Sequence, residues 1–169
     1  MLRLLVFGLG IVLASSAYGQ GTLAGPRGRA DFVGGYAGFL DESLIDHGVV
    51  AATIRYQLTP RISVGPEIVY MIGPGHDRDF FLTGNAVFDF FVRPNGARSG
   101  TVNPYLVVGG GLMRHSDRFG GMTFASGEGA LTGGAGARVW LSERLYALGE
   151  YRVGWEPHLR VTGGVGMTF

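Results

Sequence analysis

The sequence predicts an all-β protein, specifically an eight-stranded antiparallel transmembrane β-barrel. Apolar and polar residues alternate in runs between turn signals, and several runs reach ten residues or more, which is the length that a tilted membrane-spanning strand requires. Glycine supplies 31 of the 169 residues, and this abundance disfavours helices. Beyond the N-terminal segment no apolar run is long enough for a transmembrane helix, so a membrane-spanning chain must close into a barrel.

The first 19 residues are predicted to be a secretory signal peptide. Arg3 precedes an apolar run from Leu4 to Ala14, and this run is too short to span a bilayer. Ala17 and Gly19 place small residues at positions −3 and −1 of a cleavage site. We expect residues 1–19 to be the signal, residues 20–30 a flexible lead-in, and residues 31–169 one barrel domain.

Eight strands are predicted from alternating runs bounded by Gly, Pro, Asn, Asp and Ser. They lie at residues 31–40, 47–58, 61–72, 79–93, 103–114, 127–141, 144–156 and 158–169. We expect tight turns near residues 57–61 and 141–144, and more polar loops at 41–46, 73–78 and 115–126. Outer-membrane barrels alternate short periplasmic turns with longer outer loops in this way. The connections at 93–103 and 155–158 fit less well, because the first is long for a turn and the second is short for a loop.

Two of the predicted hairpins repeat one pattern of charges. Arg55 precedes Glu67, and Arg138 precedes Glu150, by the same spacing. If residue 58 pairs with 62, and residue 141 with 145, each glutamate lies diagonally opposite its arginine, within reach of long side chains. We therefore expect two diagonal ion pairs, Arg55 with Glu67 and Arg138 with Glu150.

The composition of the two strand faces predicts which face is inside. The charged face also carries small residues, including Gly65, Gly134 and Gly164, and these suit the interior of an eight-stranded barrel, which side chains just fill. The opposite face is aliphatic and aromatic, as a lipid-facing surface requires. The predicted lumen ion-pair network therefore consists of Arg55, Glu67, Arg138, Glu150, Arg152 and Arg160. A soluble barrel with the apolar face inside is the alternative.

The last strand ends in Phe169, and Met167, Gly164 and Thr162 precede it at fixed spacing. This spacing resembles the final strand of small bacterial outer-membrane barrels, the OmpA-transmembrane-domain, OmpX and OmpW-like group, as does the segment 103–105 before a glycine-rich strand. The resemblance implies export to the cell outer membrane of a Gram-negative-type bacterium. It also implies that Thr162, Gly164, Met167 and Phe169 form the signal that the barrel-assembly machinery reads.

Histidine and serine near the predicted outer rims raise the possibility of an enzyme. Some outer-membrane barrels are lipid A acylhydrolases or acyltransferases, which use such residues at the membrane surface. A nucleophile and its base must lie within hydrogen-bond reach, but the adjacent His115 and Ser116 point to opposite faces of a strand. We therefore predict no catalytic residues, and a lipid A-modifying barrel enzyme is the alternative.

Acidic and histidine side chains of the predicted outer loops are candidate ligands for a divalent cation. They are Asp41, Glu42, Asp46, His76, Asp77, Asp79 and Asp117. None of these segments contains a complete ligand loop, so we expect solvated loops, no resident metal and no cofactor. The absence of cysteine excludes disulfides, and a net charge of +1 gives no sign of nucleic-acid binding.

Together these observations predict a monomeric, integral outer-membrane protein with a structural or surface-interaction role and a lumen filled by side chains. Its expected partners are outer-membrane lipid, lipopolysaccharide and the barrel-assembly machinery. A small channel or transport barrel for small or hydrophobic solutes is the first alternative. A soluble secreted barrel that binds an apolar ligand is the second.

Overall fold

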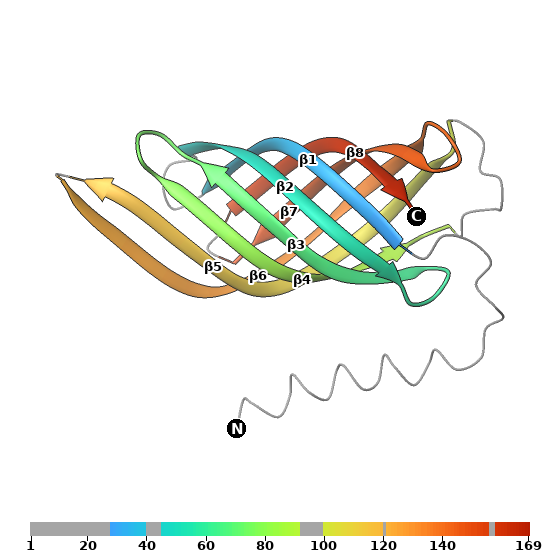
Figure 1. Cartoon of the computed structure of the whole chain (residues 1–169), viewed down its shortest axis with the longest axis horizontal. Coiled ribbons are helices and arrows are strands. Elements are labelled where there is room, and N and C mark those ends of the chain that lie inside the picture. Colours follow the sequence, from blue (N-terminus) through green and yellow to red (C-terminus); the bar gives the residue numbers. More distant parts are fainter. Residues whose placement is uncertain (1–27, 40–44, 92–99, 120, 156–157) are drawn as a thin grey trace, which may run out of the picture.

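The computed structural model describes residues 28–39, 45–91, 100–119, 121–155 and 158–169. These residues form eight strands: β1 (Gly28–Phe39), β2 (Ile45–Gln57), β3 (Ile62–Ile72), β4 (Arg78–Asp89), β5 (Val102–Phe119), β6 (Met122–Trp140), β7 (Leu145–Gly154) and β8 (His158–Thr168). Each strand pairs antiparallel with the next, and β8 pairs with β1 to close the barrel (Figure 1). The predicted fold class is therefore confirmed. Within the described ranges, no helix has the length and apolar character needed to cross a membrane.

The two repeated hairpins, β2–β3 and β6–β7, have the predicted registers. The amide of Leu58 donates to the carbonyl of Ile62 at 2.9 Å, and the amide of Leu141 donates to Leu145 at the same distance. A hydroxyl at the same position of each turn supports it: Thr59 Oγ1 and Ser142 Oγ each accept a backbone N–H three residues on. The Thr or Ser shared by the two sequence patterns therefore fixes the turns.

The barrel has two distinct ends. At the turn end lie the β2–β3 and β6–β7 turns and the end of β8. At the ribbon end, β5 and β6 continue as a two-stranded ribbon that projects beyond the other strands (Figure 1). Pairing within this ribbon runs to Phe119 opposite Met122, and Gly121 adopts a positive φ of 85° at its tip.

Several strand boundaries differ from the sequence-based prediction, including the ends of β4 and β5 and the starts of β1 and β6. Residues 115–126 were expected to form a loop, but most of them belong to β5 and β6. A ribbon that leaves the barrel buries neither face, so its residues are as polar as those of a loop, and polarity cannot distinguish the two. Strand β1 begins at Gly28 rather than residue 31, which places Arg29 in the barrel and not in a flexible lead-in.

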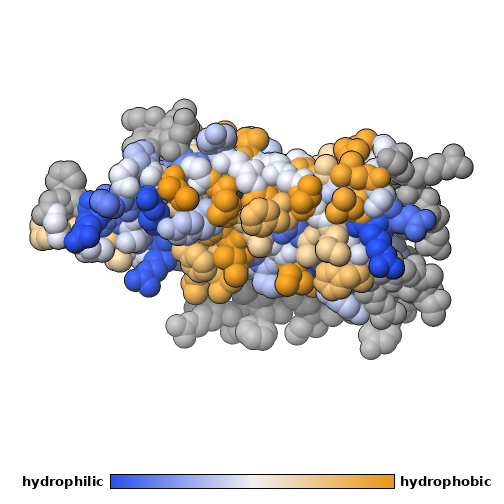
Figure 2. All heavy atoms as spheres, turned by 45° about the horizontal axis from the view of Figure 1, so that its top comes forward, coloured by the Kyte–Doolittle hydropathy of each residue, from blue (hydrophilic) through white to orange (hydrophobic). Residues whose placement is uncertain are grey.

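The two faces of the strands differ sharply in polarity. Outward side chains such as Phe32, Leu112 and Leu131 are more than half exposed, and they form an apolar band around the middle of the visible face, with hydrophilic residues toward both ends (Figure 2). Inward side chains include buried charged groups such as Arg138 and Arg152. The charged face is therefore the lumen, as the sequence predicted.

Inward glycines allow the strands to curve tightly. A Cβ atom on Gly65 would meet the backbone of Ile54 and Arg55, and one on Gly164 would meet the backbone of Phe32 and Val33. At both positions the neighbouring strand approaches so closely that only a hydrogen atom fits. The small residues of the predicted interior are therefore needed for barrel curvature as well as for filling.

Candidate functional site

The lumen at the turn end is filled by a buried network of arginines and aspartates. Asp89 binds Arg29 at 2.7 Å and also pairs with Arg138. Asp31 binds Arg55 at 2.6 Å and accepts a hydrogen bond from the hydroxyl of Tyr146. These contacts link β1, β2, β4, β6 and β7, and the pair of Arg29 with Asp89 crosses the lumen from β1 to β4.

Two glutamates organise the middle of the lumen. Glu67 accepts hydrogen bonds from Arg152 at 2.8 Å, from Arg160 at 2.9 Å and from the amide of Asn85 at 3.0 Å. Glu150 accepts a hydrogen bond from Nε of Arg152 at 2.6 Å and another from the hydroxyl of Tyr105 at 2.9 Å. Each glutamate is shared between strands, and this sharing offsets the cost of burying its charge.

The six residues predicted as a lumen network all lie buried in the lumen, but the two predicted diagonal pairs do not form. Arg55 binds Asp31, and Arg138 binds Asp89 while its guanidinium lies 4.0 Å from the centre of the Tyr105 ring. The registers agree with the prediction, so the difference lies in the side chains. Arg55 binds a carboxylate on its other neighbouring strand, β1, and Arg138 of β6 reaches β4. The side chain of arginine is long enough to reach several carboxylates, and the register of one hairpin does not show which of them it binds.

The six predicted residues leave out several members of this network, among them Arg29 and Asp31. Arg29 was assigned to the lead-in, and Asp31 was not considered as a partner for Arg55. Both residues lie on the same alternating face as Val33, so Asp31 could have been found within the predicted strand, and Arg29 by extending its period-two pattern by two residues.

The network fills the described part of the lumen with side chains. All of its charged side chains are nearly inaccessible, including Arg138 at 0% and Arg152 at 1% exposure. Several guanidinium nitrogens, including Nη2 of Arg138 and Nη2 of Arg152, have no hydrogen-bond acceptor among the described residues. Toward the ribbon end the lumen changes character and is filled by apolar side chains such as Val69, Met71 and Phe81.

A second polar cluster lies beyond this apolar layer, at the ribbon end. His47 of β2 contacts Asp77, which precedes β4, with Nε2 and Oδ2 2.7 Å apart. Asp79 of β4 contacts His115 of β5, with Oδ1 and Nδ1 2.7 Å apart. The cross contacts, His47 with Asp79 and His115 with Asp77, are both 3.6 Å. We call these four residues the ribbon-end cluster.

The ribbon-end cluster contains only part of the predicted cation candidates. Asp77 and Asp79 belong to it. Asp41, Glu42 and the side chain of Asp46 lie outside the described residues. His47 was not among the candidates, because it lies within a strand and was not connected to the loop residues that the register brings beside it.

The residues of the predicted assembly signal lie along β8. Thr162 and Gly164 face the lumen, whereas Met167 and Phe169 face outward. Phe169 and Gly28 exchange two backbone hydrogen bonds of 3.0 Å. A Cβ atom on Gly28 would strike the Phe169 ring, so this ring covers a glycine at the seam where the barrel closes. Whether the assembly machinery reads these residues stays a prediction.

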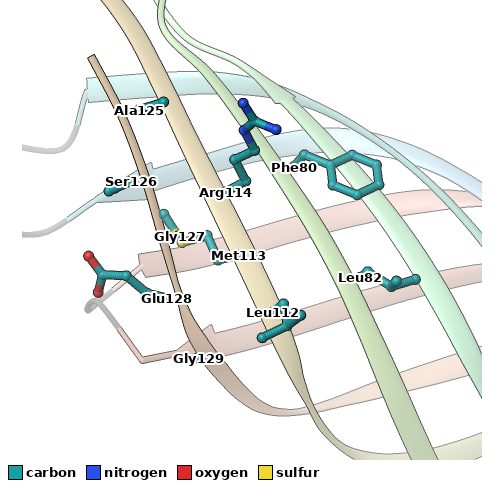
Figure 3. A pocket seen from close by; sticks show the side chains of 10 residues that line it. All are labelled: Phe80, Leu82, Leu112, Met113, Arg114, Ala125, Ser126, Gly127, Glu128 and Gly129. Atoms are coloured by element: carbon teal, nitrogen blue, oxygen red, sulfur yellow. The ribbon is translucent and has the colours of Figure 1, made fainter.

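A groove of about 680 Å³ lies on the outside of the barrel, beside β4, β5 and β6. Its apolar lining includes Phe80, Leu82 and Leu112, while Arg114 and Glu128 lie toward the ribbon (Figure 3). An apolar groove next to an exposed arginine has the chemistry of a site for a lipid chain and its anionic headgroup.

Comparisons with known proteins support the fold. No protein-family model matches the chain, and no curated protein sequence matches it. The N-terminal β-barrel domain of Pseudomonas aeruginosa OprF is similar in structure, with a TM-score of 0.66, 15% identity, and coverage of 86% of this chain and 100% of that domain. Neisserial surface protein A gives a TM-score of 0.67 at 15% identity, covering 84% of this chain and 96% of that one.

A third similar structure is Ail, the attachment invasion locus protein of Yersinia pestis. Its TM-score is 0.55 at 12% identity, and the match covers 85% of this chain and 97% of Ail. These neighbours are small eight-stranded outer-membrane barrels. At such low identity the likeness shows the fold alone, so membership of the OmpA, OmpX and OmpW-like group in particular stays a prediction.

Proposed function

We propose that this protein is an integral outer-membrane barrel with a structural or surface-interaction role, and that its lumen is closed to general solutes. One observation carries the proposal: an apolar band faces outward while the charged side chains are paired inside. In aqueous solution this arrangement would be strongly unfavourable, because it buries charges and exposes large apolar side chains. A lipid bilayer favours it.

The two alternatives receive less support from the same side chains. A soluble barrel that binds an apolar ligand needs an apolar cavity, but the middle of the lumen holds Glu67, Arg152 and Arg160 in contact. A channel for small or hydrophobic solutes needs an open path, and eight strands enclose little more than their own side chains.

Under this proposal the ribbon end faces the cell exterior and the turn end faces the periplasm, because outer-membrane barrels keep their short turns inside. The β5–β6 ribbon is then the part of the described chain that reaches farthest from the membrane. We also propose that lipopolysaccharide and outer-membrane lipid surround the barrel, with Arg114 and Arg118 available to anionic headgroups. The barrel-assembly machinery completes the proposed partners.

We propose no enzymatic activity. His115 contacts Asp79 inside the ribbon end, while the next residue, Ser116, follows on the other face of β5. A histidine and serine arranged in this way cannot act together on one acyl group.

The proposal is tested by membrane fractionation followed by electrophoresis in SDS with and without boiling. A closed outer-membrane barrel is expected in the outer-membrane fraction, and its mobility is expected to change on boiling because the barrel resists SDS when cold. A protein that appears in the soluble periplasmic fraction, with no change of mobility on boiling, would overturn the proposal and favour the soluble barrel.

A further inference from the structure

We propose that the ribbon-end cluster is a binding site for one divalent transition-metal ion of the Zn²⁺ type. His47, Asp77 and Asp79 supply three ligand atoms, and His115 at the rim supplies the fourth. The inference goes beyond the proposed function and does not depend on it, because the site is built from side chains whose geometry is independent of the cellular location of the barrel.

The positions of the ligand atoms support this inference. One potential ligand atom from each of His47, Asp77 and Asp79 lies within 4.8 Å of the others. Ligand atoms at bond lengths of about 2.0–2.2 Å around a tetrahedral Zn²⁺ lie about 3.3–3.6 Å apart. The two cross contacts of the cluster, His47 to Asp79 and His115 to Asp77, are both 3.6 Å.

The unpaired carboxylate oxygens provide a second, independent observation. Asp79 has 1% of its side chain exposed, and among the described residues its Oδ2 has no hydrogen-bond partner. Oδ1 of Asp77 is likewise buried without a partner in the described part of the chain. Leaving such acceptors unpaired is costly, and two carboxylates that share one pocket also repel each other. A bound cation would remove both costs.

The two contacts of 2.7 Å fit the metal-free form of the same site. In each contact an imidazole nitrogen lies at hydrogen-bond distance from a carboxylate oxygen. A metal ion binds an imidazole nitrogen that carries no hydrogen. Zinc binding would therefore replace these two hydrogen bonds with metal–ligand bonds.

The ligand types select the class of metal. Ca²⁺ and Mg²⁺ prefer sets made entirely of oxygen atoms, whereas imidazole favours Zn²⁺, Cu²⁺ and Ni²⁺. Two imidazoles and two carboxylates therefore favour a transition-metal ion over the divalent cations that bridge lipid phosphates.

The surrounding structure holds the site in place and leaves it an entry. Arg78 does not neutralise the carboxylates, since its guanidinium donates to the backbone carbonyls of Gly73, Gly75 and Asp77 and so fixes the β3–β4 loop. A Cβ atom on Gly73 would strike both His47 and Asp77, so the backbone covers that side closely. Access remains from the rim, where the His115 side chain is 31% exposed.

The test is a titration of the tag-free, folded protein in detergent with ZnCl₂, in which binding is measured by calorimetry. The same titration with MgCl₂ is the comparison. We expect one Zn²⁺ per chain, no comparable Mg²⁺ binding, and a higher unfolding temperature with zinc, because a ligand that binds only the folded state stabilises it. Co²⁺ in the same site is expected to give the intense visible absorption of a tetrahedral complex.

Matched variants locate the binding. Asp79→Asn keeps the shape of the side chain and is expected to weaken zinc affinity at least about tenfold. His76→Gln is the control, because His76 is an exposed histidine of the same loop outside the cluster. The zinc affinity of this variant is expected to match that of the wild-type protein. If Asp79→Asn fails to fold, His115→Asn at the partly exposed rim replaces it.

Two results would overturn the inference. The first is the absence of saturable zinc binding by the wild-type protein, which would leave the cluster as a hydrogen-bonded His–Asp network. The second is zinc binding that persists unchanged in Asp79→Asn or His115→Asn, or that is lost in His76→Gln, since either pattern would place the metal elsewhere. Neither result depends on membrane fractionation, so failure here is distinguishable from failure of the proposed function.

Discussion

At the scale of single residues, some of the inward glycines lie so close to a neighbouring strand that no side chain fits at their positions. The Cα of Gly164 lies so close to β1 that a methyl group would meet the backbone of Phe32 and Val33. Backbone cannot move aside as a flexible side chain can, so relief requires a shift of the whole strand pair. The position of such a glycine is visible in the sequence, but its contact with the next strand depends on the register.

Gly164→Ala is therefore expected to lower the free energy of unfolding by about 1–3 kcal/mol, the usual cost of overpacking. Gly149→Ala is the matched control, because a Cβ atom there meets no atom within 4 Å, and we expect a change within about 0.5 kcal/mol. Urea unfolding in detergent measures both. Equal effects of the two substitutions would contradict the steric explanation.

The buried charges give a second prediction at this scale. Glu67→Ala removes the carboxylate that binds Arg152 and Arg160, and removing one member of a buried charged network costs about 3–5 kcal/mol. The exposed Glu128 is the control, and Glu128→Ala is expected to change stability by less than about 0.5 kcal/mol. A Glu67→Ala variant as stable as the control would show that water replaces the lost contacts.

At the scale of secondary structure, the sequence predicts strand number, order and hairpin register, because period-two alternation and turn residues are local signals. It fails where the local signal is ambiguous. The β5–β6 ribbon has no buried face, and β1 begins within a glycine-rich segment that also resembles a linker. Arg29 and Arg138 bind Asp89 on a strand that is not paired with their own, and the distances between such strands depend on the closed barrel rather than on one strand or hairpin.

The ribbon is expected to be dispensable for barrel formation. Among the described strands, its outer part pairs only within the ribbon. Replacing residues 117–124 by an Asn-Gly turn, which suits a two-residue hairpin connection, therefore leaves the eight-strand closure and His115 in place. We expect the shortened protein to retain its change of mobility on boiling and its unfolding midpoint. Loss of the SDS-resistant form would show that the ribbon contributes to folding of the barrel.

The end of β8 gives a second prediction at this scale. Phe169→Ala uncovers Gly28 at the seam and removes the terminal aromatic residue of the proposed assembly signal, so less folded protein is expected in the outer membrane. Phe91→Ala is the control, because Phe91 is equally exposed, at 62% against 61% for Phe169. Equal outer-membrane levels of the two variants would count against a special role for the last residue.

At the scale of the whole molecule, the two lumen layers act in series. A charged network fills the turn end and the middle, and apolar side chains such as Met71 and Phe81 follow toward the ribbon end. An ion would have to leave water, displace paired charges and then cross an apolar layer. The sequence predicts a filled lumen from strand number alone, but the apolar layer becomes apparent only when the registers align its residues.

Purified protein in planar lipid bilayers is therefore expected to show no porin-like conductance. A variant that widens the charged layer, Arg152→Ala together with Glu67→Ala, is expected to show more frequent or larger current steps than the wild type, because side chains rather than backbone close the lumen. Steady, large conductance in the wild-type protein would instead favour the channel alternative.

The seam between β1 and β8 has a consequence for how the protein is made. Gly28 and Phe169 are hydrogen-bonded neighbours, so the first and last strands of the described barrel meet only when every strand between them is in place. Until then, β1 and β8 present open edges that are able to pair with other chains. A polypeptide in this open form needs protection from aggregation, and the pairing of Gly28 with Phe169 is part of the closure that removes the need.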